Sequence, residues 1–283
     1  MKWLLFAILN LCFIIPVSSN LHAGNKEAPI PPHRWKIAIH SQSFNHLTFF
    51  EAVDKAKEAG VKYIEAAPNQ KLGGGMEGTT NYNMPIQIQK QVLKKLRKSG
   101  IKLISYGDIT CNTNAEWEKL FQFAKSMGIK TIITEAQTED IDLIDHLCNQ
   151  YHIKAAIHNH PNPSSYWHPD KVIKALQNHT KMIGACCDNG HWMRSGIVPS
   201  DAYQKLGAYI ISLHLKDMNG FDDMNAHTVS LGTGKFNFIE TLRFLKLQKF
   251  DGIITLEFEY SRDNSFLEIK QSVETLKKIL DSL

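Results

Sequence analysis

The sequence predicts an α/β protein folded as a closed (β/α)8 barrel, the TIM-barrel architecture, and three observations carry this prediction. Short apolar runs rich in β-branched residues alternate with segments of helical spacing, which is the pattern of repeated βα units around a parallel sheet. Eight such units follow one another without surplus, over residues 35–283, close to the ~250 residues typical of one barrel. A dinucleotide-binding open sheet would have a Gly-x-Gly-x-x-Gly motif after its first strand, and this sequence has none there.

Each predicted element has its own signal. The predicted strands begin at Trp35, Lys62, Lys102, Lys130, Lys154, Met182, Tyr209 and Gly252. Three segments between the first four predicted strands have apolar residues at helical spacing and end in Gly, as helices commonly do. They are FFEAVDKAKEAG, IQIQKQVLKKLRKSG and AEWEKLFQFAKSMG. The segment SFLEIKQSVETLKKIL predicts a closing helix. Residues 35–283 are therefore expected to form a single catalytic domain.

The N-terminus has the pattern of a secretory signal peptide over residues 1–19. A basic start precedes the apolar stretch WLLFAILNLCFIIPV and the small residues Ser18 and Ser19. This stretch is shorter than the ~20 residues that span a bilayer, so no stable membrane span is expected after cleavage, although an uncleaved anchor is an alternative. Residues 20–34 are expected to be a flexible lead-in. The protein is predicted to be secreted or periplasmic.

Charge and cysteine content exclude two classes of protein. The net charge of +4 is spread over helical segments without a basic block, which argues against a nucleic-acid partner. The cysteines beyond the signal segment show no Cys-x-x-Cys spacing, and we expect buried free thiols rather than a disulfide framework. They are Cys111, Cys148, Cys186 and Cys187.

Four potential metal ligands each lie at the C-terminal end of a different predicted strand. They are Glu135, Asp188, His214 and Glu257. Active sites of this fold lie at that end of the barrel. A carboxylate on a strand buried on both faces costs several kcal/mol unless it is paired or emerges into the mouth, so a functional site is the better explanation. Three carboxylates and one imidazole favour Mn²⁺, Mg²⁺ or Co²⁺, with Zn²⁺ as an alternative.

Further polar residues are expected around these ligands. His158 and His160 alternate on the fifth strand and so point to the same side. We predict that they bind substrate or lie just beneath the site, with ligation of a second metal as the less favoured alternative. Glu65 ends the second strand at similar depth, where it can bind a substrate hydroxyl or orient a neighbour.

The order of these residues resembles the xylose-isomerase-like TIM-barrel superfamily, and within it the sugar isomerase and epimerase branch. The motifs that carry the resemblance are Glu135, Asp188-Asn-Gly-His191, His214-Leu-Lys216-Asp217 and Glu257. The segment VSLGTGKFNF from Val229 is similar to the Leu-Gly-x-Gly turn of that branch. The branch includes ketose 3-epimerases and inosose dehydratases, so the resemblance specifies the fold and the metal site more narrowly than the reaction.

The resemblance also implies roles for individual residues. Glu135 and Glu257 would each bind the metal and move a proton at a carbon next to a carbonyl that the metal polarises. His191 would contact a substrate oxygen. Lys216 would stabilise negative charge on the substrate, or instead be a partner of Asp217 or of a carboxylate ligand. Ketose epimerases often place an arginine soon after the histidine of strand seven, and here none follows His214 closely.

The sequence therefore predicts an exported, divalent-metal-dependent isomerase or epimerase acting on a small sugar or cyclitol. The alternative within the same chemistry is a metal-dependent lyase or dehydratase on keto-sugars, keto-glycosides or inososes. A non-catalytic sugar-binding protein is a third class, which the complete ligand set disfavours. A DNA-repair endonuclease is disfavoured by the dispersed basic residues. The exact substrate and the oligomeric state stay open, and a homo-oligomer is compatible with the sequence.

Overall fold

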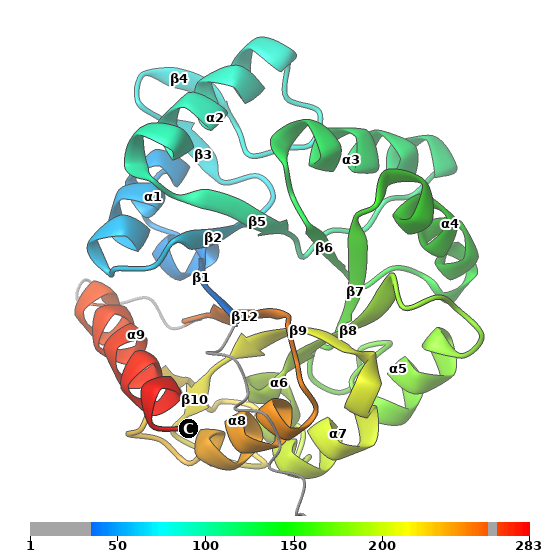
Figure 1. The fold of residues 1–283 in the computed structure, drawn as a ribbon, viewed down its shortest axis with the longest axis vertical. Helices are drawn as coiled ribbons and strands as arrows, with labels where there is room; N and C mark the ends of the chain where they lie inside the picture. The colour runs from blue at the N-terminus through cyan, green and yellow to red at the C-terminus, as the bar shows by residue number, and fades with distance from the viewer. Residues whose placement is uncertain (1–34, 260–264) are drawn as a thin grey trace, which may run out of the picture. The chain divides into compact units, whose positions relative to one another are not determined.

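Eight parallel strands close into a barrel (Figure 1). The structure is a computed structural model that describes residues 35–259 and 265–283. The predicted signal segment and lead-in lie outside these residues. Around the barrel, each strand pairs with the next, and β1 pairs with β12 to close the ring. The strands are, in chain order, β1 (Lys36–His40), β2 (Tyr63–Ala66), β5 (Lys102–Tyr106), β6 (Thr131–Thr134), β7 (Lys154–His158), β8 (Ile183–Asp188), β9 (Ile210–Leu215) and β12 (Ile253–Leu256). The predicted barrel is confirmed.

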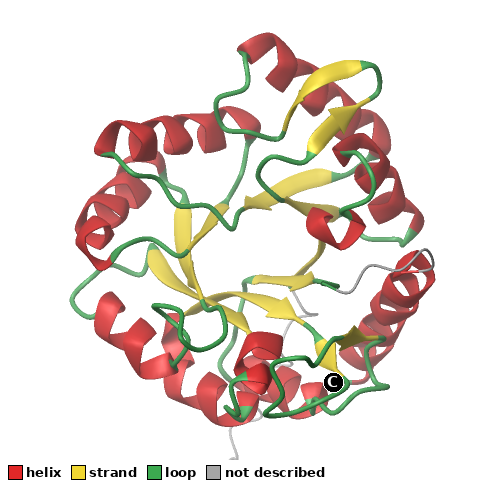
Figure 2. Ribbon diagram, turned by 180° about the vertical axis from the view of Figure 1, so that it is seen from behind, coloured by secondary structure: helices red, strands yellow, loops and turns green. Residues whose placement is uncertain are grey.

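Helices surround the strands on the outside of the barrel (Figure 2). They are α1 (Phe49–Glu58), α2 (Ile86–Ser99), α3 (Asn114–Met127), α4 (Ile141–Tyr151), α5 (Pro169–Leu176), α6 (Asn189–Arg194), α7 (Pro199–Leu206), α8 (Phe238–Leu247) and α9 (Ser265–Ser282). Local sequence sets their ends. Thr48 and Thr113 form capping boxes with the glutamate three residues later, and Gly100 and Gly128 end α2 and α3 in the left-handed conformation.

The connections contain short additional elements. They are η1 (Ser41–Phe44), β3 (Lys71–Gly73), β4 (Met76–Thr79), η2 (Thr138–Asp140), η3 (Gly207–Tyr209), β10 (Asp217–Met218) and β11 (Thr228–Val229). The strands β3 and β4 form an antiparallel hairpin, and β10 pairs with β11 in the loop that follows β9. None of the helices within residues 35–259 and 265–283 has the length and apolar character that a membrane span requires.

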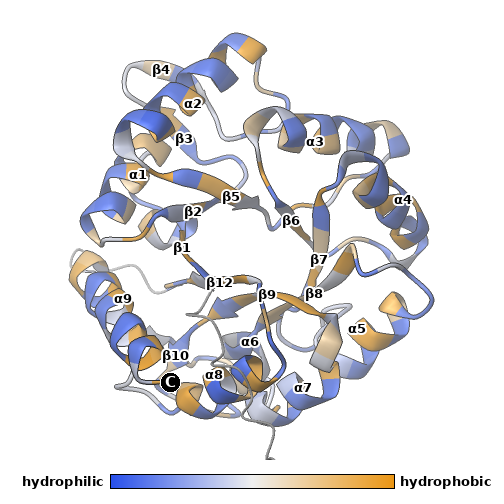
Figure 3. Cartoon of the chain, viewed as in Figure 1, coloured by the Kyte–Doolittle hydropathy of each residue, from blue (hydrophilic) through white to orange (hydrophobic). Residues whose placement is uncertain are grey.

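The main hydrophobic core lies between the strands and the helices. Hydrophobic residues follow the barrel strands, whereas the helices carry both hydrophobic and hydrophilic residues (Figure 3). Trp117, Leu120 and Phe121 of α3 are completely buried in this core. The cysteines of the described chain, Cys111, Cys148, Cys186 and Cys187, are buried and free, as the sequence predicts. Among the buried polar residues, His158 and Asp188 are the last residues of their strands, and Glu65 and His214 are the last but one.

Asparagine side chains extend the pairing of three neighbouring strands beyond their last residues. Asn159 follows β7, and its amide donates to the carbonyl of Asp188 at 2.9 Å and accepts from the same residue's N–H at 2.8 Å. Asn189 follows β8 and makes the equivalent pair of bonds to the backbone of Lys216. These bonds hold the ends of β7, β8 and β9 in register, so the side chains there have fixed positions.

A buried carboxylate organises the loop that follows β9. Asp217 accepts hydrogen bonds from the backbone N–H groups of Gly232 at 2.8 Å, Gly234 at 2.9 Å and Phe236 at 3.1 Å. It also accepts from the N–H of Met218 at 2.9 Å. A Cβ atom at Gly234 would lie 2.2 Å from a carboxylate oxygen of Asp217, so only glycine fits there. This close packing explains the second glycine of the Leu-Gly-x-Gly turn.

We predict that Asp217→Asn lowers the free energy of unfolding by about 2 kcal/mol, because an amide nitrogen would replace an oxygen that faces N–H donors. Urea denaturation at neutral pH measures this change. Asp281→Asn, an exposed position on α9, is the matched control and is expected to leave the stability unchanged. Equal stability of Asp217→Asn and the control would contradict the proposed anchoring of the loop.

Candidate metal centre and active site

Three of the four predicted metal ligands lie together at the barrel mouth. Asp188, His214 and Glu257 come from the ends of β8, β9 and β12, which are neighbours in the barrel. One potential ligand atom of each lies within 4.8 Å of those of the others. The Nδ1 atom of His214 is 2.9 Å from Oε2 of Glu257 and 3.8 Å from Oδ2 of Asp188. All three side chains are buried.

The facing atoms of these residues are buried. Asp188 Oδ2, His214 Nδ1 and Glu257 Oε2 make no well-aligned hydrogen bond within the described chain, although the Lys216 ammonium lies 2.7 Å from Asp188 Oδ2 and 3.2 Å from Glu257 Oε2. Buried polar atoms without a well-aligned partner are costly, and native proteins commonly satisfy them with an ion or water. Two carboxylates and an imidazole that converge in this way match the ligand chemistry of a divalent cation. The residues present therefore fit a metal ion.

Glu65 determines which nitrogen of His214 faces the other ligands. The Nε2 atom of His214 lies 2.7 Å from Oε1 of Glu65, so a proton on Nε2 is directed away from the cluster and Nδ1 is left to bind a metal. Ser105 and Thr255 donate to the other oxygen of Glu65 at 2.5 Å and 3.0 Å. Glu65 is completely buried, and these protein groups bind its carboxylate. Glu65 therefore orients the candidate metal ligand His214 from behind.

Burial and pairing shift the pKa values of this pair strongly. Burial alone would raise the pKa of Glu65, but the charge and hydrogen bond of His214 lower it to about 2. For His214, burial acts to lower the pKa, but the carboxylates of Glu65 and Glu257 raise it well above its ordinary value. Glu65 is therefore ionised at every physiological pH, and binding of a cation at Nδ1 would displace a proton from the ring.

Lys216 lies among carboxylates. Its Nζ atom is 2.7 Å from Oδ2 of Asp188 and 3.2 Å from Oε2 of Glu257, and it also contacts Glu259. Although burial acts to lower the pKa of Lys216, these carboxylates raise it above the ordinary range, so the ammonium stays charged. A Cβ atom at Gly190 would lie 2.8 Å from Cδ of Lys216, so glycine leaves the space through which this side chain passes.

Two roles are expected for Lys216 from the sequence, substrate contact or pairing with a carboxylate. In the structure its ammonium contacts Asp188, Glu257 and Glu259, whereas Asp217 binds the backbone of the following loop. The fixed cation balances part of the negative charge beside the candidate metal ligands.

His191 lies in a cluster with two residues that the sequence did not single out. Its Nε2 atom is 3.2 Å from Oε1 of Glu259, and its Nδ1 atom is 3.0 Å from Nη1 of Arg194. Burial lowers the pKa of His191 to about 3, so the ring is neutral. Arg194 also pairs with Glu259. The sequence spacing could have indicated both residues. Arg194 is three residues after His191 on α6, and Glu259 is two residues after Glu257, so each lies on the same side of its segment as the predicted site residue.

Glu135 is directed to a second cluster on the other side of the mouth. Its Oε2 atom lies 2.8 Å from Nδ1 of His160. Burial acts to raise the pKa of Glu135, but His160 lowers it, and the same hydrogen bond raises the pKa of His160. Asp108, just after β5, lies 3.7 Å from Nδ1 of both His158 and His160. The sequence did not indicate Asp108, which follows its strand as an ordinary turn residue would.

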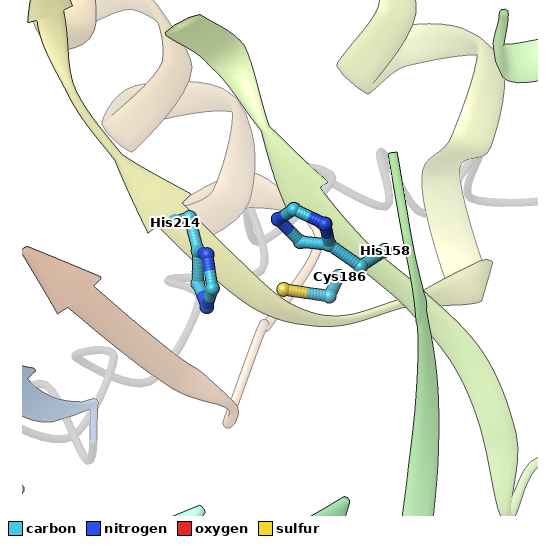
Figure 4. Close-up of side chains that lie close together, drawn as sticks. All are labelled: His158, Cys186 and His214. Carbon is cyan, nitrogen blue, oxygen red and sulfur yellow. The ribbon is translucent and has the colours of Figure 1, made fainter. Parts of the chain in front are cut away.

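His158 also faces the first cluster. Its Nε2 atom is 3.5 Å from Oδ2 of Asp188, and its ring centre is 4.8 Å from that of His214. Figure 4 shows these two rings, with the Cys186 side chain on the strand between their two strands, directed into the same space. Burial raises the pKa of Cys186, so its thiol is neutral. The barrel mouth thus holds two polar clusters with His158 between them.

Comparison with known proteins agrees with the barrel fold. The family described as xylose isomerase-like TIM barrel matches residues 53–279. The chain belongs to this family. A crystal structure of an uncharacterised protein from Parabacteroides distasonis, 34% identical, superimposes with a TM-score of 0.70 over 87% of this chain and 99% of that chain.

Less similar solved structures share the barrel fold. A D-tagatose 3-epimerase-like protein is 19% identical, with a TM-score of 0.67 over 87% of this chain and 97% of that one. The probable 3-DHS dehydratase of petrobactin synthesis from Bacillus anthracis is 19% identical, with a TM-score of 0.66 over 86% and 98%. At this identity they show the fold alone.

A sequence relative covers less of the chain. An uncharacterised protein of Methanocaldococcus jannaschii is 32% identical over 141 residues, which are 48% of this chain and 45% of that protein. The match therefore spans about half of the relative's length.

The buried Glu65 carboxylate makes a pH-dependent contribution to stability. Its pKa falls from 4.5 to about 2 on folding, so its ionised form stabilises the fold above pH 4.5. This stabilisation, about 3 kcal/mol, is lost as the pH falls from there toward 2. In urea denaturation, we expect Glu65→Gln to be less stable than the unmodified chain at about pH 6, and the difference to shrink at about pH 3.5.

The exposed variant Glu274→Gln on α9 serves as the control and is expected to match the unmodified chain at both pH values. A stability difference for Glu65→Gln that stays constant between the two pH values would contradict the assigned role of Glu65.

Proposed function

We propose that the protein is a divalent-metal-dependent enzyme that isomerises or epimerises a small sugar or cyclitol by proton transfer next to a carbonyl. The observation that carries this proposal is the convergence of Asp188, His214 and Glu257, whose facing atoms are buried and make no well-aligned hydrogen bond among the described residues. A divalent ion bound there would polarise a substrate carbonyl and make the neighbouring C–H group more acidic. The rest of the chemistry depends on the chain's own side chains.

Barrel topology supports a two-sided proton transfer. In the closed strand order, β6 and β12 are separated by three strands on either side, so Glu135 and Glu257 come from opposite sides of the mouth. A substrate carbon held between them would have a carboxylate on each face. One carboxylate can remove a proton from one face while the other returns a proton to the opposite face, which inverts the carbon.

The two carboxylates have different surroundings. Glu135 is half-buried and shares a hydrogen bond with His160, which can pass its proton to and from the mouth. Glu257 is buried beside Lys216 and His214, and the coulombic effects of Lys216, His40 and His214 overcome burial and keep its pKa well below the ordinary value. Glu135 is therefore the better placed base, and Glu257 combines metal binding with the second proton position.

Neutral His191 can orient a substrate hydroxyl, since its ring is held by Arg194 and Glu259. A pocket borders this group and is lined by Pro161, Arg194, Met224, Asn225, Ala226, His227 and Glu259. These polar groups suit a hydroxylated ligand. No arginine follows His214 closely in the sequence. Arg194 of α6 nevertheless places a guanidinium near the site, where it pairs with Glu259.

One observation favours an elimination reaction as the second candidate. Loss of a leaving group needs an acid that protonates the departing oxygen, and the hydrogen bond to Glu135 raises the pKa of His160, whose side chain is 41% exposed at the mouth. A lyase or dehydratase acting on a keto-sugar, keto-glycoside or inosose would use the same first proton abstraction. We also propose, from the signal-like sequence of residues 1–19, that the protein acts outside the cytoplasm.

Incubation with Mn²⁺ and a panel of ketoses, inososes and 3-keto-sugars in heavy water tests the reaction. We expect solvent deuterium in an isomeric product, because the abstracted proton exchanges before its return. An unsaturated or cleaved product would instead support elimination. Ligand binding without turnover after addition of Mn²⁺, Mg²⁺, Co²⁺ or Zn²⁺ would contradict an enzymatic role.

We predict that Glu257→Gln lowers turnover by about 10²–10⁴-fold and weakens metal binding, since it removes a charged ligand that also carries a proton. Metal content after dialysis and steady-state rates measure the two effects. Glu274→Gln, on the exposed face of α9, should retain both. Unchanged metal content and turnover in Glu257→Gln would show that the proposed centre is wrong.

A further inference from the structure

The end of the barrel opposite the mouth is rich in lysine. In a closed parallel barrel all strands begin at this end, and the connections from each helix to the next strand lie there. In the described chain, the first residue of each barrel strand and the two residues before it include one carboxylate, that of Asp251, and a set of lysines that we call the lysine face. These are Lys36, Lys62, Lys102, Lys130, Lys154 and Lys181.

Strand pairing brings these lysines together from distant parts of the sequence. The backbone N–H of Lys102 donates to the carbonyl of Lys62 at 2.9 Å, and the N–H of Lys154 donates to the carbonyl of Lys130 at 3.0 Å. Three members from different strands, Lys36, Lys130 and Lys154, line a single hollow of about 400 Å³. The hollow lies at the end of the barrel axis, because its apolar lining comes from strands all around the barrel. This lining includes Ile104, Ile211 and Ile253.

Most of the lysine face has no counter-charge in the described part of the chain. All its members except the half-buried Lys36 are exposed. Lys36 lies 3.5 Å from Asp251, and no other member forms an ion pair with a residue in 35–259 or 265–283. Cations that the fold gathers on one surface repel one another, and an anionic partner offsets this repulsion. The charge of the lysine face is therefore available to a ligand outside the protein.

Apolar side chains lie at the same end as the lysines. Leu247, the last residue of α8, is 77% exposed, and the exposed Lys249 follows two residues later. Trp35 and Phe250 are half-buried, and their rings pack edge to face with centres 5.8 Å apart. Lysine next to tryptophan and exposed leucine is typical of protein surfaces that lie in the interfacial region of a membrane.

The mouth has the opposite character, which would orient the protein on a charged surface. It holds several carboxylates, of which the Lys216 ammonium balances only a part. These carboxylates belong to Asp108, Glu135, Asp188, Glu257 and Glu259. An anionic surface therefore attracts the lysine face and repels the mouth, so the mouth stays open to a dissolved substrate.

The position at which the chain enters the barrel favours a lipid surface as this partner. Trp35 and Lys36 bring the chain into β1 at the end that carries the lysine face. The sequence before them contains the apolar stretch WLLFAILNLCFIIPV, at residues 3–17. A membrane that holds this stretch, during export or through an uncleaved anchor, would meet the lysine face before any other part of the barrel.

We propose that the lysine face docks on the surface of an anionic lipid bilayer and holds the barrel with its mouth directed away from the membrane. Lipid phosphates bind the ammonium groups around the hollow that Lys36, Lys130 and Lys154 line. Leu247 enters the headgroup region beside them. This docking is independent of the reaction at the mouth, and it adds a location to the proposed enzyme.

Sedimentation of the full chain with lipid vesicles tests this proposal. One set of vesicles contains phosphatidylcholine alone, and the other contains an equimolar mixture of phosphatidylcholine and phosphatidylglycerol. The stretch at residues 3–17 can enter either kind, so the measured quantity is the ratio of the binding constants for anionic and neutral vesicles. We expect the combined changes Lys102→Gln, Lys130→Gln and Lys154→Gln to lower this ratio about 10²-fold, since each lysine near an anionic surface contributes about fivefold. Added salt should lower the ratio for the unmodified chain as well.

The matched control combines Lys90→Gln, Lys119→Gln and Lys171→Gln. It removes the same charge from exposed positions in the first halves of α2, α3 and α5, toward the mouth, and should keep most of the anionic preference. Circular dichroism checks that both triple variants are folded. An unchanged ratio in the lysine-face variant would overturn the proposal, and so would an equal loss in the control. Binding of inorganic phosphate or nucleic acid without a preference for anionic vesicles would also overturn it. All of these outcomes leave the proposed reaction at the mouth intact.

Discussion

The buried ammonium of Lys216 is the interaction on which the arrangement of the mouth depends. Asp188 and Glu257 approach the same region from β8 and the end of β12, and Glu259 follows two residues later. Carboxylates brought this close repel one another strongly in a poorly hydrated interior. The Lys216 ammonium contacts all three, and the glycine at position 190 makes room for its stem. The first cluster can therefore form before a metal ion is present.

The division of the mouth into two halves follows from strand order. Neighbouring strands β8, β9 and β12 supply one polar cluster, and β5, β6 and β7 supply the other. Glu65 and His40 from β2 and β1 lie behind Glu257 and His214, where they contact these residues. Every barrel strand thus contributes a polar end to the mouth or to its support. Substitution of residues at these strand ends can change which substrate binds, while the barrel below stays apolar and closed.

The sequence was sufficient for the barrel because each strand has its own apolar run and each helix its own periodicity and end signals. It also located the strand-end residues, since chemistry at a barrel mouth requires polar residues where the strand pattern stops. It could not assign their partners. Whether Glu65 faces a substrate or His214, and whether Glu135 joins Asp188 or His160, depends on barrel curvature and side-chain direction. Asp108 gave no signal at all, because a turn after a strand commonly contains aspartate.

Asp217 has a consequence for how this protein can diversify. The same strand end presents a candidate ligand at His214, a charge-balancing group at Lys216 and an anchor for the following turn at Asp217. Because Asp217 binds Met218 on one side and Gly232 and Gly234 on the other, both ends of the intervening loop are held in place. Residues between these ends can change in sequence and length during evolution without moving the ligands. Substrate preference could therefore drift while the chemical step is conserved.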